Sequence, residues 1–539
     1  MSQAKSFDRM RTVCKGAVGL LLTFSWVSIA VANSFTWDGA AGQYDWSEDA
    51  NWLEGTAPSS SADNQLWFVS GAGEKGSLAN PLNQDIADPL QVDSLWFDTV
   101  NNYYIDGQPI RVTPSSANDG FNAVRIDNVV RIQNDISLGA DARINIMDGT
   151  GNASLDFHGS VDLDEHSLTL ETDNQFRRIQ FLGLVEGTGG FVIRGHTFRP
   201  VFVFSQSNTF SGGLATREGE VDGADIRVRA DQALGTGVIE LSQRRAQLGT
   251  RAVEFNADAG PVTLPNDFIF RTRSNQNQPH SLTMFSGDTI TLTGNIELNS
   301  ANTVNETYLQ SDGEVVFAGI IQDDAGANGT RRDLNFAAGN GTFVVGDNIH
   351  TYEGQTNVGH DWASGQQLTV RIDGDITSSS GVVVHEDATL RGTGTLPTVA
   401  VRDGGLLRPG NSVGTLTVDG MVNMEDGSIL QIDIVDDEAG RVSILGSSNH
   451  MDFLGAVTLD ITGTLGSGPY TIVSWEDAAT GYGMFDAILL NGDAVAWQQS
   501  GWDVDYGDTH ITLIPEPSTT LLLLLGSGLL WGIRRACCG

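Results

Sequence analysis

The chain has 539 residues and a formal net charge of −37, because 67 acidic residues stand against 30 basic ones. This charge repels nucleic acid and anionic lipid headgroups, so we expect no nucleic-acid partner. The apolar content of 40% is too high for a disordered acidic tail. A chain this long exceeds a typical compact domain, but an elongated repeat protein can form one structural unit at this length.

The first segment, residues 1–32, predicts export. Basic residues precede an apolar stretch at 16–30, and the small-x-small sequence Ala30-Val31-Ala32 follows. This order is typical of a secretory signal peptide cleaved after Ala32, so we expect Sec-type export machinery as a partner. The alternative is an uncleaved N-terminal anchor helix, although the apolar stretch is shorter than the roughly 20 residues that span a bilayer.

Residues 33–129 form the expected N-terminal β cap region. Five tryptophans gather there, namely Trp37, Trp46, Trp52, Trp67 and Trp96. Indole rings on a surface can stack against carbohydrate, whereas indole rings inside a cap pack its core. Both interpretations stay open from the sequence.

The body of the chain alternates apolar and polar residues with a period of two, as in the stretch TITLTGNIELNS. Gly, Asn and Asp separate these runs, which indicates short strands joined by turns and an all-β body. Late in the chain, strands begin near Val382, Val399, Leu416 and Leu430. This close, regular spacing favours a solenoid, in which stacked coils create a shared core. We therefore expect Val399 and Leu416 to begin successive coils and to stack in one internal ladder.

The stretch from Gly392 to Gly420 is similar to the passenger-associated strand repeat of autotransporters. The signature residues are Pro409, Gly410, Asn411, Ser412, Gly414 and Leu416. Similar stretches begin at Asn208 and Ile349. The resemblance implies a right-handed parallel β-helix over residues 130–440. No C-terminal membrane barrel follows the repeats, so we do not expect the chain to secrete itself.

Residues 441–513 are the expected C-terminal β cap, and residues 514–539 form a separate tail, IPEPSTTLLLLLGSGLLWGIRRACCG. The apolar residues 519–533 predict a transmembrane helix, with the following arginines on the cytoplasmic side. This order resembles the PEP-CTERM sorting signal of Gram-negative bacteria. The matching residues are Pro515, Glu516, Pro517, Arg534 and Arg535.

The PEP-CTERM resemblance implies a membrane-tethered intermediate that an exosortase-like enzyme cuts, and an association with exopolysaccharide. The alternative is a plain anchor that is never cut. Because all three cysteines lie near the ends, at Cys14, Cys537 and Cys538, a chain trimmed at both ends carries no disulfide.

Several polar clusters are candidate sites, and each has a simpler interpretation. The acidic stretches 162–166 and 433–438 could hold catalytic carboxylates, as in polysaccharide-cleaving enzymes, or could be solvated turns. Residues 271–280 could form a binding loop. Ca²⁺ could bind acidic turns such as 373–376, although the nonapeptide calcium repeat is absent. No residue is assigned as catalytic, cofactor-binding or metal-ligating, and no cofactor is expected.

Two functions follow from these patterns. The first is a non-catalytic β-helix protein of the cell surface or extracellular matrix, with a role in adhesion or exopolysaccharide organisation. The second is a polysaccharide lyase or glycoside hydrolase on the same scaffold. A groove with converging carboxylates and a basic residue would favour the enzyme.

Overall fold

The computed structural model describes residues 33–516. Within this range the described chain excludes 117–118, 127, 149–152, 173–176, 196–199, 217–222, 244–252, 273–280, 301–305, 325–330, 361–364 and 480–481. The signal segment with Ala30 and Ala32, and the tail from Pro517 through Arg534 and Arg535, lie outside the described residues. Across the described part of the chain, no helix has the length and apolar character needed to cross a membrane.

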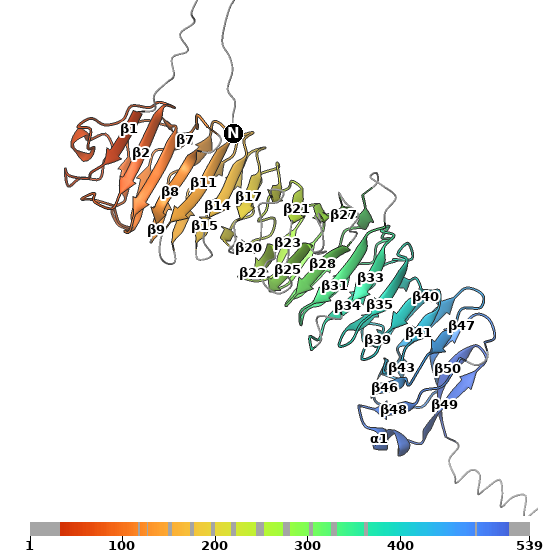
Figure 1. Ribbon diagram of the computed structural model, residues 1–539. Helices are drawn as coiled ribbons and strands as arrows, with labels where there is room; N and C mark the ends of the chain where they lie inside the picture. The colour runs from red at the N-terminus through yellow and green to blue at the C-terminus, as the bar shows by residue number, and fades with distance from the viewer. Residues whose placement is uncertain are drawn as a thin grey trace, which may run out of the picture.

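The protein is an elongated parallel β-solenoid (Figure 1). Each coil passes along three faces, and each strand pairs with strands of the coils before and after it. Period-two sequences suit this arrangement, because alternate side chains point into the coil and out to solvent. The all-β, parallel solenoid expected from the sequence is therefore confirmed.

The first face is a 12-stranded sheet, continued near the C-terminal end by a 6-stranded sheet. The 12-stranded sheet contains β1 (Asn33–Trp37), β2 (Asn64–Val69), β5 (Ser94–Thr99), β8 (Gly120–Ile126), β11 (Ala142–Asp148), β14 (Leu168–Thr172), β17 (Phe191–Gly195), β19 (Leu214–Thr216), β21 (Ile239–Gln243), β24 (Phe268–Thr272), β27 (Ile296–Ser300) and β30 (Ile321–Asp323). The 6-stranded sheet contains β37 (Thr395–Leu396), β40 (Thr415–Asp419), β44 (Arg441–Leu445), β47 (Tyr470–Trp475), β50 (His510–Pro515) and β49 (Trp502–Gly507). Single bridges at Ile349, Asp375 and Thr395 connect the two sheets.

The second face is one 16-stranded sheet that runs almost the whole length of the rod. It contains β3 (Leu82–Gln84), β6 (Tyr103–Gly107), β9 (Val129–Ile132), β12 (Ser154–Phe157), β15 (Arg178–Phe181), β18 (Val201–Phe204), β20 (Ala224–Val228), β22 (Val253–Ala257), β25 (Ser281–Gly287), β28 (Glu306–Ser311), β31 (Asp333–Ala338), β33 (Gln355–Val358), β35 (Gly381–Val384), β38 (Val399–Val401), β41 (Val422–Met424) and β45 (Met451–Phe453).

The third face is divided into a 5-stranded and an 11-stranded sheet. The first contains β4 (Leu90–Val92), β7 (Ile110–Val112), β10 (Ile136–Leu138), β13 (Val161–Asp162) and β16 (Val185–Glu186). The second contains β23 (Val262–Leu264), β26 (Ile290–Leu292), β29 (Glu314–Phe317), β32 (Thr342–Val345), β34 (Thr369–Ile372), β36 (Thr389–Gly392), β39 (Leu406–Pro409), β42 (Ile429–Val435), β46 (Thr458–Gly463), β48 (Ala487–Leu490), with β43 (Glu438–Ala439) antiparallel to β42. Helix is confined to a 3-10 turn (Asp49–Asn51) and α1 (Ala494–Gln498) among the described residues.

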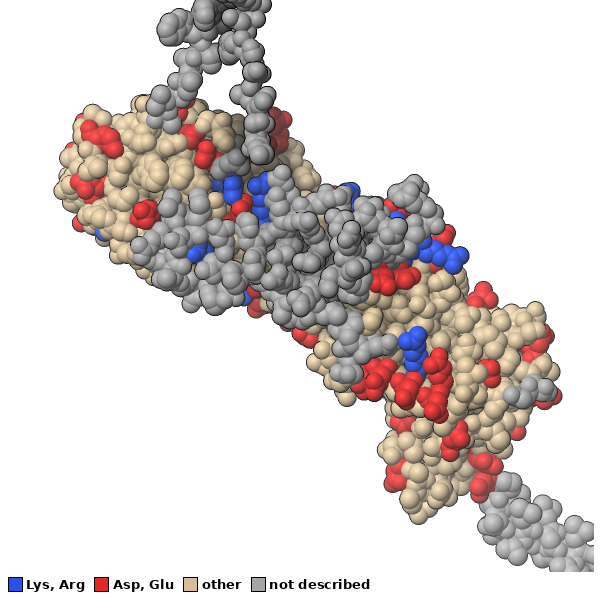
Figure 2. Space-filling model, viewed as in Figure 1, with Lys and Arg blue, Asp and Glu red and all other residues tan. Residues whose placement is uncertain are grey.

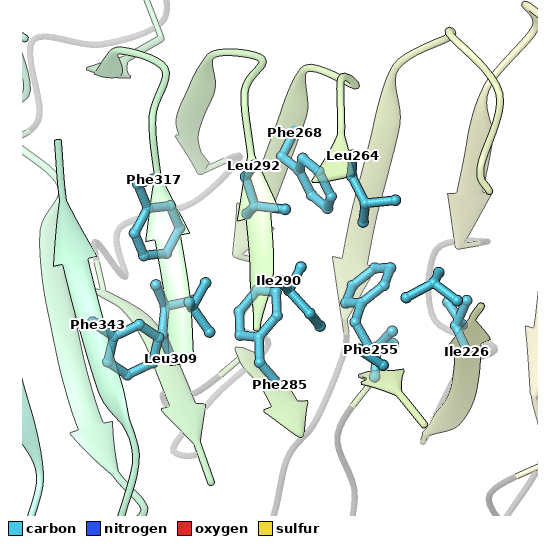
Figure 3. Close-up of a cluster of buried hydrophobic side chains, with 14 of the residues drawn as sticks. Ile226, Phe255, Leu264, Phe268, Phe285, Ile290, Leu292, Leu309, Phe317 and Phe343 are labelled. Atoms are coloured by element: carbon cyan, nitrogen blue, oxygen red, sulfur yellow. The ribbon is translucent and has the colours of Figure 1, made fainter. Parts of the chain in front are cut away.

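The core is a set of apolar ladders that run along the rod. Phe157, Phe181 and Phe204 occupy one register position in three successive coils, and their ring centroids are 5.3 Å apart in stacked geometry. Further along, Phe255 stacks on Phe285 and Phe317 stacks on Phe343 (Figure 3). Identical neighbours in a parallel ladder bury each other's faces, so each coil depends on the next for its core.

The expected ladder that joins Val399 to Leu416 is wrong. Val399 pairs with Val382 and Val422 on the 16-stranded sheet, whereas Leu416 lies on β40 of the 6-stranded sheet. Both side chains are buried. The repeat-signature turn lengthens the coil that follows Val399. A step from Val399 equal to the one between Val382 and Val399 therefore ends on a different face, at Leu416.

Parallel pairing begins at β1 and crosses the boundary expected between residues 129 and 130 without a change in pattern. The N-terminal end of the rod is filled by Trp37, Trp46 and Trp52, which are buried and meet edge to face. At the other end the pattern changes, because β50 pairs antiparallel with both β47 and β49. An antiparallel hairpin therefore covers the last parallel coil of this sheet.

Candidate functional site

The repeat signature forms a corner of the coil between β39 and β40. Gly410 and Gly392 exchange backbone hydrogen bonds of 2.8 and 3.2 Å, which fold the turn back against the preceding coil. Gly410 and Gly414 have φ of +86° and +142°, which glycine adopts without a Cβ penalty, and Ser412 between them has a φ of +108°. The signature residues therefore shape a corner, and Leu416 behind it enters the core.

Of the sorting-signal residues, Pro515 and Glu516 lie within the described chain. Pro515 is the last residue of β50, opposite Trp502, and the Glu516 amide donates to the Gly501 carbonyl at 2.8 Å. Both residues are exposed. The start of the Pro-Glu-Pro sequence is thus extended chain at the surface of the C-terminal hairpin.

The acidic stretches do not converge with one another. The Asp164 carboxylate lies 3.5 Å from Arg111 in a turn, and Asp433 pairs with Arg408 at 2.7 Å on the third face. Hydrogen bonds from the Tyr470 hydroxyl and from Ser467 lower the pKa of Asp437, which stands in the turn after β42. Among the described residues, no group of three or more His, Cys, Asp or Glu side chains is arranged to hold a metal.

Asp373 and Asp375, in the turn considered for Ca²⁺, have protein partners. Asp373 accepts from Arg371 at 2.7 Å, and Asp375 accepts from the amide and hydroxyl of Thr377. These contacts hold the turn between β34 and the next coil. Most of the candidate loop 271–280 lies outside the described residues.

The five tryptophans of residues 33–129 divide into two groups with different surroundings. Trp37, Trp46 and Trp52 are buried in the end of the rod. Trp67 and Trp96 instead point outward from β2 and β5, are half-buried, and stack with ring centroids 4.5 Å apart and planes within 12°. The cap-packing interpretation holds for the first group, and only the second group is available to a ligand.

The stacked indoles begin a row of outward side chains on the 12-stranded sheet. The strand register aligns Trp67, Trp96, Asn122, Asn145, Glu171 and Arg194, one from each successive coil. We call this set the aromatic–polar row. Because neighbouring strands lie about 4.8 Å apart, the row extends for about 24 Å along the rod.

The polar half of the row is closely packed. Asn122, Asn145 and Glu171 are buried although they stand on the outward side of their strands. The Glu171 carboxylate lies 2.5 Å from Arg143 and 3.8 Å from Arg194. Blue and red side chains lie next to one another over β11, β14 and β17 (Figure 2).

Two atoms beside this ion-pair group lack partners. Within the described part of the chain, Asn145 Oδ1 and Arg143 Nε are buried and make no hydrogen bond. Buried polar atoms are rarely left unpaired, and an ordered water or ion can supply such a partner. Nearby, burial and the Asp93 carboxylate raise the pKa of Asp119, which precedes β8.

The row combines groups that recognise carbohydrate. Aromatic rings can accept the apolar C–H face of a sugar. The accessible members of the row are Trp67, Trp96 and Arg194, because Asn122, Asn145 and Glu171 are buried. The sequence indicates the tryptophans of the row, but it does not indicate Asn122, Asn145 and Glu171. In the sequence these polar residues recur about once per coil. This recurrence can be interpreted only when the strand register is known.

A second group of polar side chains lies on the 16-stranded sheet and at the corners that directly follow its strands. The His360 and His385 rings stack at 5.8 Å, Tyr308 lies 5.6 Å from His360, and Arg402 lies 3.4 Å from His385. The Tyr308 hydroxyl donates to Glu306 at 2.8 Å, and burial raises the Tyr308 pKa above its usual range. Tyr308 and His385 are buried, whereas His360 is half-buried and Arg402 is exposed.

Comparison of the chain with protein-family models and with curated proteins matches nothing.

Proposed function

We propose that this chain is a non-catalytic, exported β-helix protein of the cell surface or extracellular matrix that binds polysaccharide along the aromatic–polar row. The observation that carries the proposal is the outward stack of Trp67 on Trp96, continued by buried amide and charged groups in the same register. A rigid row along a rod suits an extended polymer, because one contact can be repeated from coil to coil.

Export, sorting and the right-handed coil enter the proposal through the resemblances in the sequence. A signal peptide would pass the chain to Sec-type machinery, and an exosortase-like enzyme would act near Pro515, Glu516 and Pro517. Exposure of Pro515 and Glu516 supports this, because a processing enzyme needs accessible, extended chain. The protein would then leave its inner-membrane tether for the surface or matrix.

Binding is tested by titrating the full chain with hydroxyethyl cellulose, a neutral β-glucan, and following tryptophan fluorescence. We expect binding by the unmodified chain and a loss of about tenfold in affinity for the double variant Trp67→Ala and Trp96→Ala. Trp96→Phe keeps an aromatic ring and should retain most of the affinity. Equal binding by the double variant and the unmodified chain would refute the proposed row.

Sorting is tested separately, in hosts with and without an exosortase. Mass spectrometry of C-terminal peptides should show loss of Cys537-Cys538-Gly539 only where the exosortase is present. An intact end in both hosts would mean that the tail is a plain anchor.

The enzyme alternative would act through clustered carboxylates, and a structural observation weighs against it. The acidic stretches at 162–166 and 433–438 lie on separate coils, and Tyr308 and His385 are buried. Release of unsaturated or reducing sugar ends from a polysaccharide would favour the enzyme over the binding protein.

A further inference from the structure

Three arginines stand in register on the third face, far along the chain from the aromatic–polar row. Arg371 on β34 pairs with Arg391 on β36, and Arg391 pairs with Arg408 on β39. Val370, Leu390 and Leu407 beside them are buried, so the alternation of the strands points all three guanidinium groups outward. We call this set the arginine ladder.

The outer two arginines are neutralised and the central one is not. Arg371 Nε donates to Asp373 and Arg408 Nε donates to Asp433, each at 2.7 Å. Arg391 makes one hydrogen bond, to the Asn411 amide oxygen of the repeat-signature turn. Among the described residues no carboxylate forms an ion pair with Arg391, and its Nε is buried without a partner.

This arrangement is electrostatically unfavourable without a further anion. The three arginines stand on adjacent strands, which lie about 4.8 Å apart, and like charges directly opposite each other destabilise a sheet. Burial lowers the pKa of Arg391, the charges of Arg408 and Arg371 lower it further, and Asp433 and Asp373 compensate only in part. The ladder therefore carries one guanidinium charge more than its carboxylates balance.

We propose that the arginine ladder binds a carboxylate of an acidic polysaccharide, with Arg391 as the central contact. A guanidinium group presents parallel N–H donors that match a planar carboxylate, and Arg391, which is half-buried, is the arginine of the ladder that no aspartate pairs with among the described residues. Arg371 and Arg408 flank this contact on the coils on either side, each already paired with an aspartate.

A structural role for Arg391 is the competing explanation, because its bond to Asn411 helps to hold the signature turn. The variant Arg391→Gln separates the two roles, since glutamine keeps an N–H donor for Asn411 and removes the charge. Arg441→Gln is the matched control. Arg441 is exposed on the 6-stranded sheet, and within the described part of the chain its side chain bonds only the Thr415 hydroxyl, so this variant makes the same change in net charge elsewhere.

The experiment measures binding of the full chain to polygalacturonate, which has a carboxylate on every sugar, and to its fully methyl-esterified form. We expect binding to polygalacturonate that weakens as NaCl rises, and weaker binding to the ester. Arg391→Gln should lose about tenfold in affinity for polygalacturonate, and Arg441→Gln less than about twofold. Equal affinity for acid and ester, or an unchanged Arg391→Gln variant, would overturn the proposal.

Folding is followed in the same samples by thermal unfolding. If the Arg391→Gln variant does not fold, Arg391→Lys takes its place. Lysine keeps the positive charge but lacks the planar, paired N–H donors of the guanidinium group, so this variant should bind polygalacturonate more weakly than the unmodified chain. Unchanged binding by Arg391→Lys would then overturn the proposal. The inference does not rest on the aromatic–polar row, because the two sites lie on different faces and are tested with different polymers and different variants.

Discussion

At the scale of single residues, stability comes from ladders in which one side chain recurs in successive coils. Phe181 has a stacked phenylalanine on each side, Phe157 and Phe204, and a third ring, Phe191, against its edge. Removal of a central ring leaves a cavity that rigid neighbouring backbones cannot close. The centre of a ladder is therefore more sensitive than any exposed apolar position.

Phe181→Ala should lower the free energy of unfolding by about 3–5 kcal/mol. Leu454→Ala is the control, because Leu454 is 58% exposed, and its effect should stay within about 0.5 kcal/mol. Denaturant unfolding followed by circular dichroism measures both. Similar losses for the two variants would contradict the importance of the stack.

Ion pairs on the outer faces add a pH-dependent contribution. Asp258 accepts from Arg229 at 2.7 and 2.9 Å and from Arg227 at 3.2 Å. The hydrogen bond from Arg229 is the main reason that the pKa of Asp258 is lowered, and the charges of both arginines add to it. A carboxyl group whose pKa is lower in the folded state stabilises the fold only while it is ionised.

Asp258→Asn should therefore lower stability by on the order of 1 kcal/mol at pH 7. The difference from the unmodified chain should persist above the ordinary aspartate pKa of about 3.9 and disappear as pH falls through the lower folded pKa. Thermal unfolding of both chains from pH 7 to pH 2 measures this. A difference that is constant with pH would mean that charge is not involved.

At the scale of elements, the third face shows how a coil continues where a strand is missing. Between β16 and β23 no strand of this face is present in the described chain, and Asn208 fills the position instead. Its side chain accepts from the Val185 amide at 2.8 Å and donates to the Ala233 carbonyl at 2.6 Å. A buried asparagine thus joins three coils through backbone groups that would otherwise be unpaired.

Asn208→Ala should lower the free energy of unfolding by about 2–4 kcal/mol, because it leaves two buried backbone groups without partners. Gln206→Ala, on the exposed surface two residues earlier, is the control. Hydrogen exchange should show faster exchange at Val185 in the Asn208 variant. Unchanged protection there would mean that water replaces the side chain.

At the scale of the whole molecule, the rod ends differ from its middle. Each coil contacts its neighbours, so a terminal coil exposes both apolar side chains and unpaired strand edges. The buried tryptophans occupy one end, and the β49–β50 hairpin with α1 occupies the other. The hairpin meets β47 in antiparallel pairing and so blocks further parallel addition on that sheet.

A chain that ends at Gly501 lacks this hairpin and should associate into oligomers or aggregate at micromolar concentration. A chain that ends at Glu516 keeps the hairpin and should remain monodisperse. Size-exclusion chromatography with light scattering compares the two. If both chains behaved alike, the hairpin would not act as a cap.

Much of this architecture could be predicted from the sequence, because a period-two pattern with Gly, Asn and Asp turns describes each strand locally. The repeat signature also marked a real corner at Gly410–Gly414. The division of the rod into faces could not be predicted in the same way. Coil length changes from one coil to the next, so the step from Val399 reaches Val422 and not Leu416.

The acidity, the β content and the alternation of strands and turns can be read from the amino-acid sequence, because each depends on residue types and their near neighbours. Which distant residues share a row depends on how the coils stack. Trp67 and Trp96, or Arg371, Arg391 and Arg408, meet because stacked coils place equivalent positions one strand apart. Strand register between coils is set by core packing and corner hydrogen bonds, which no local pattern encodes.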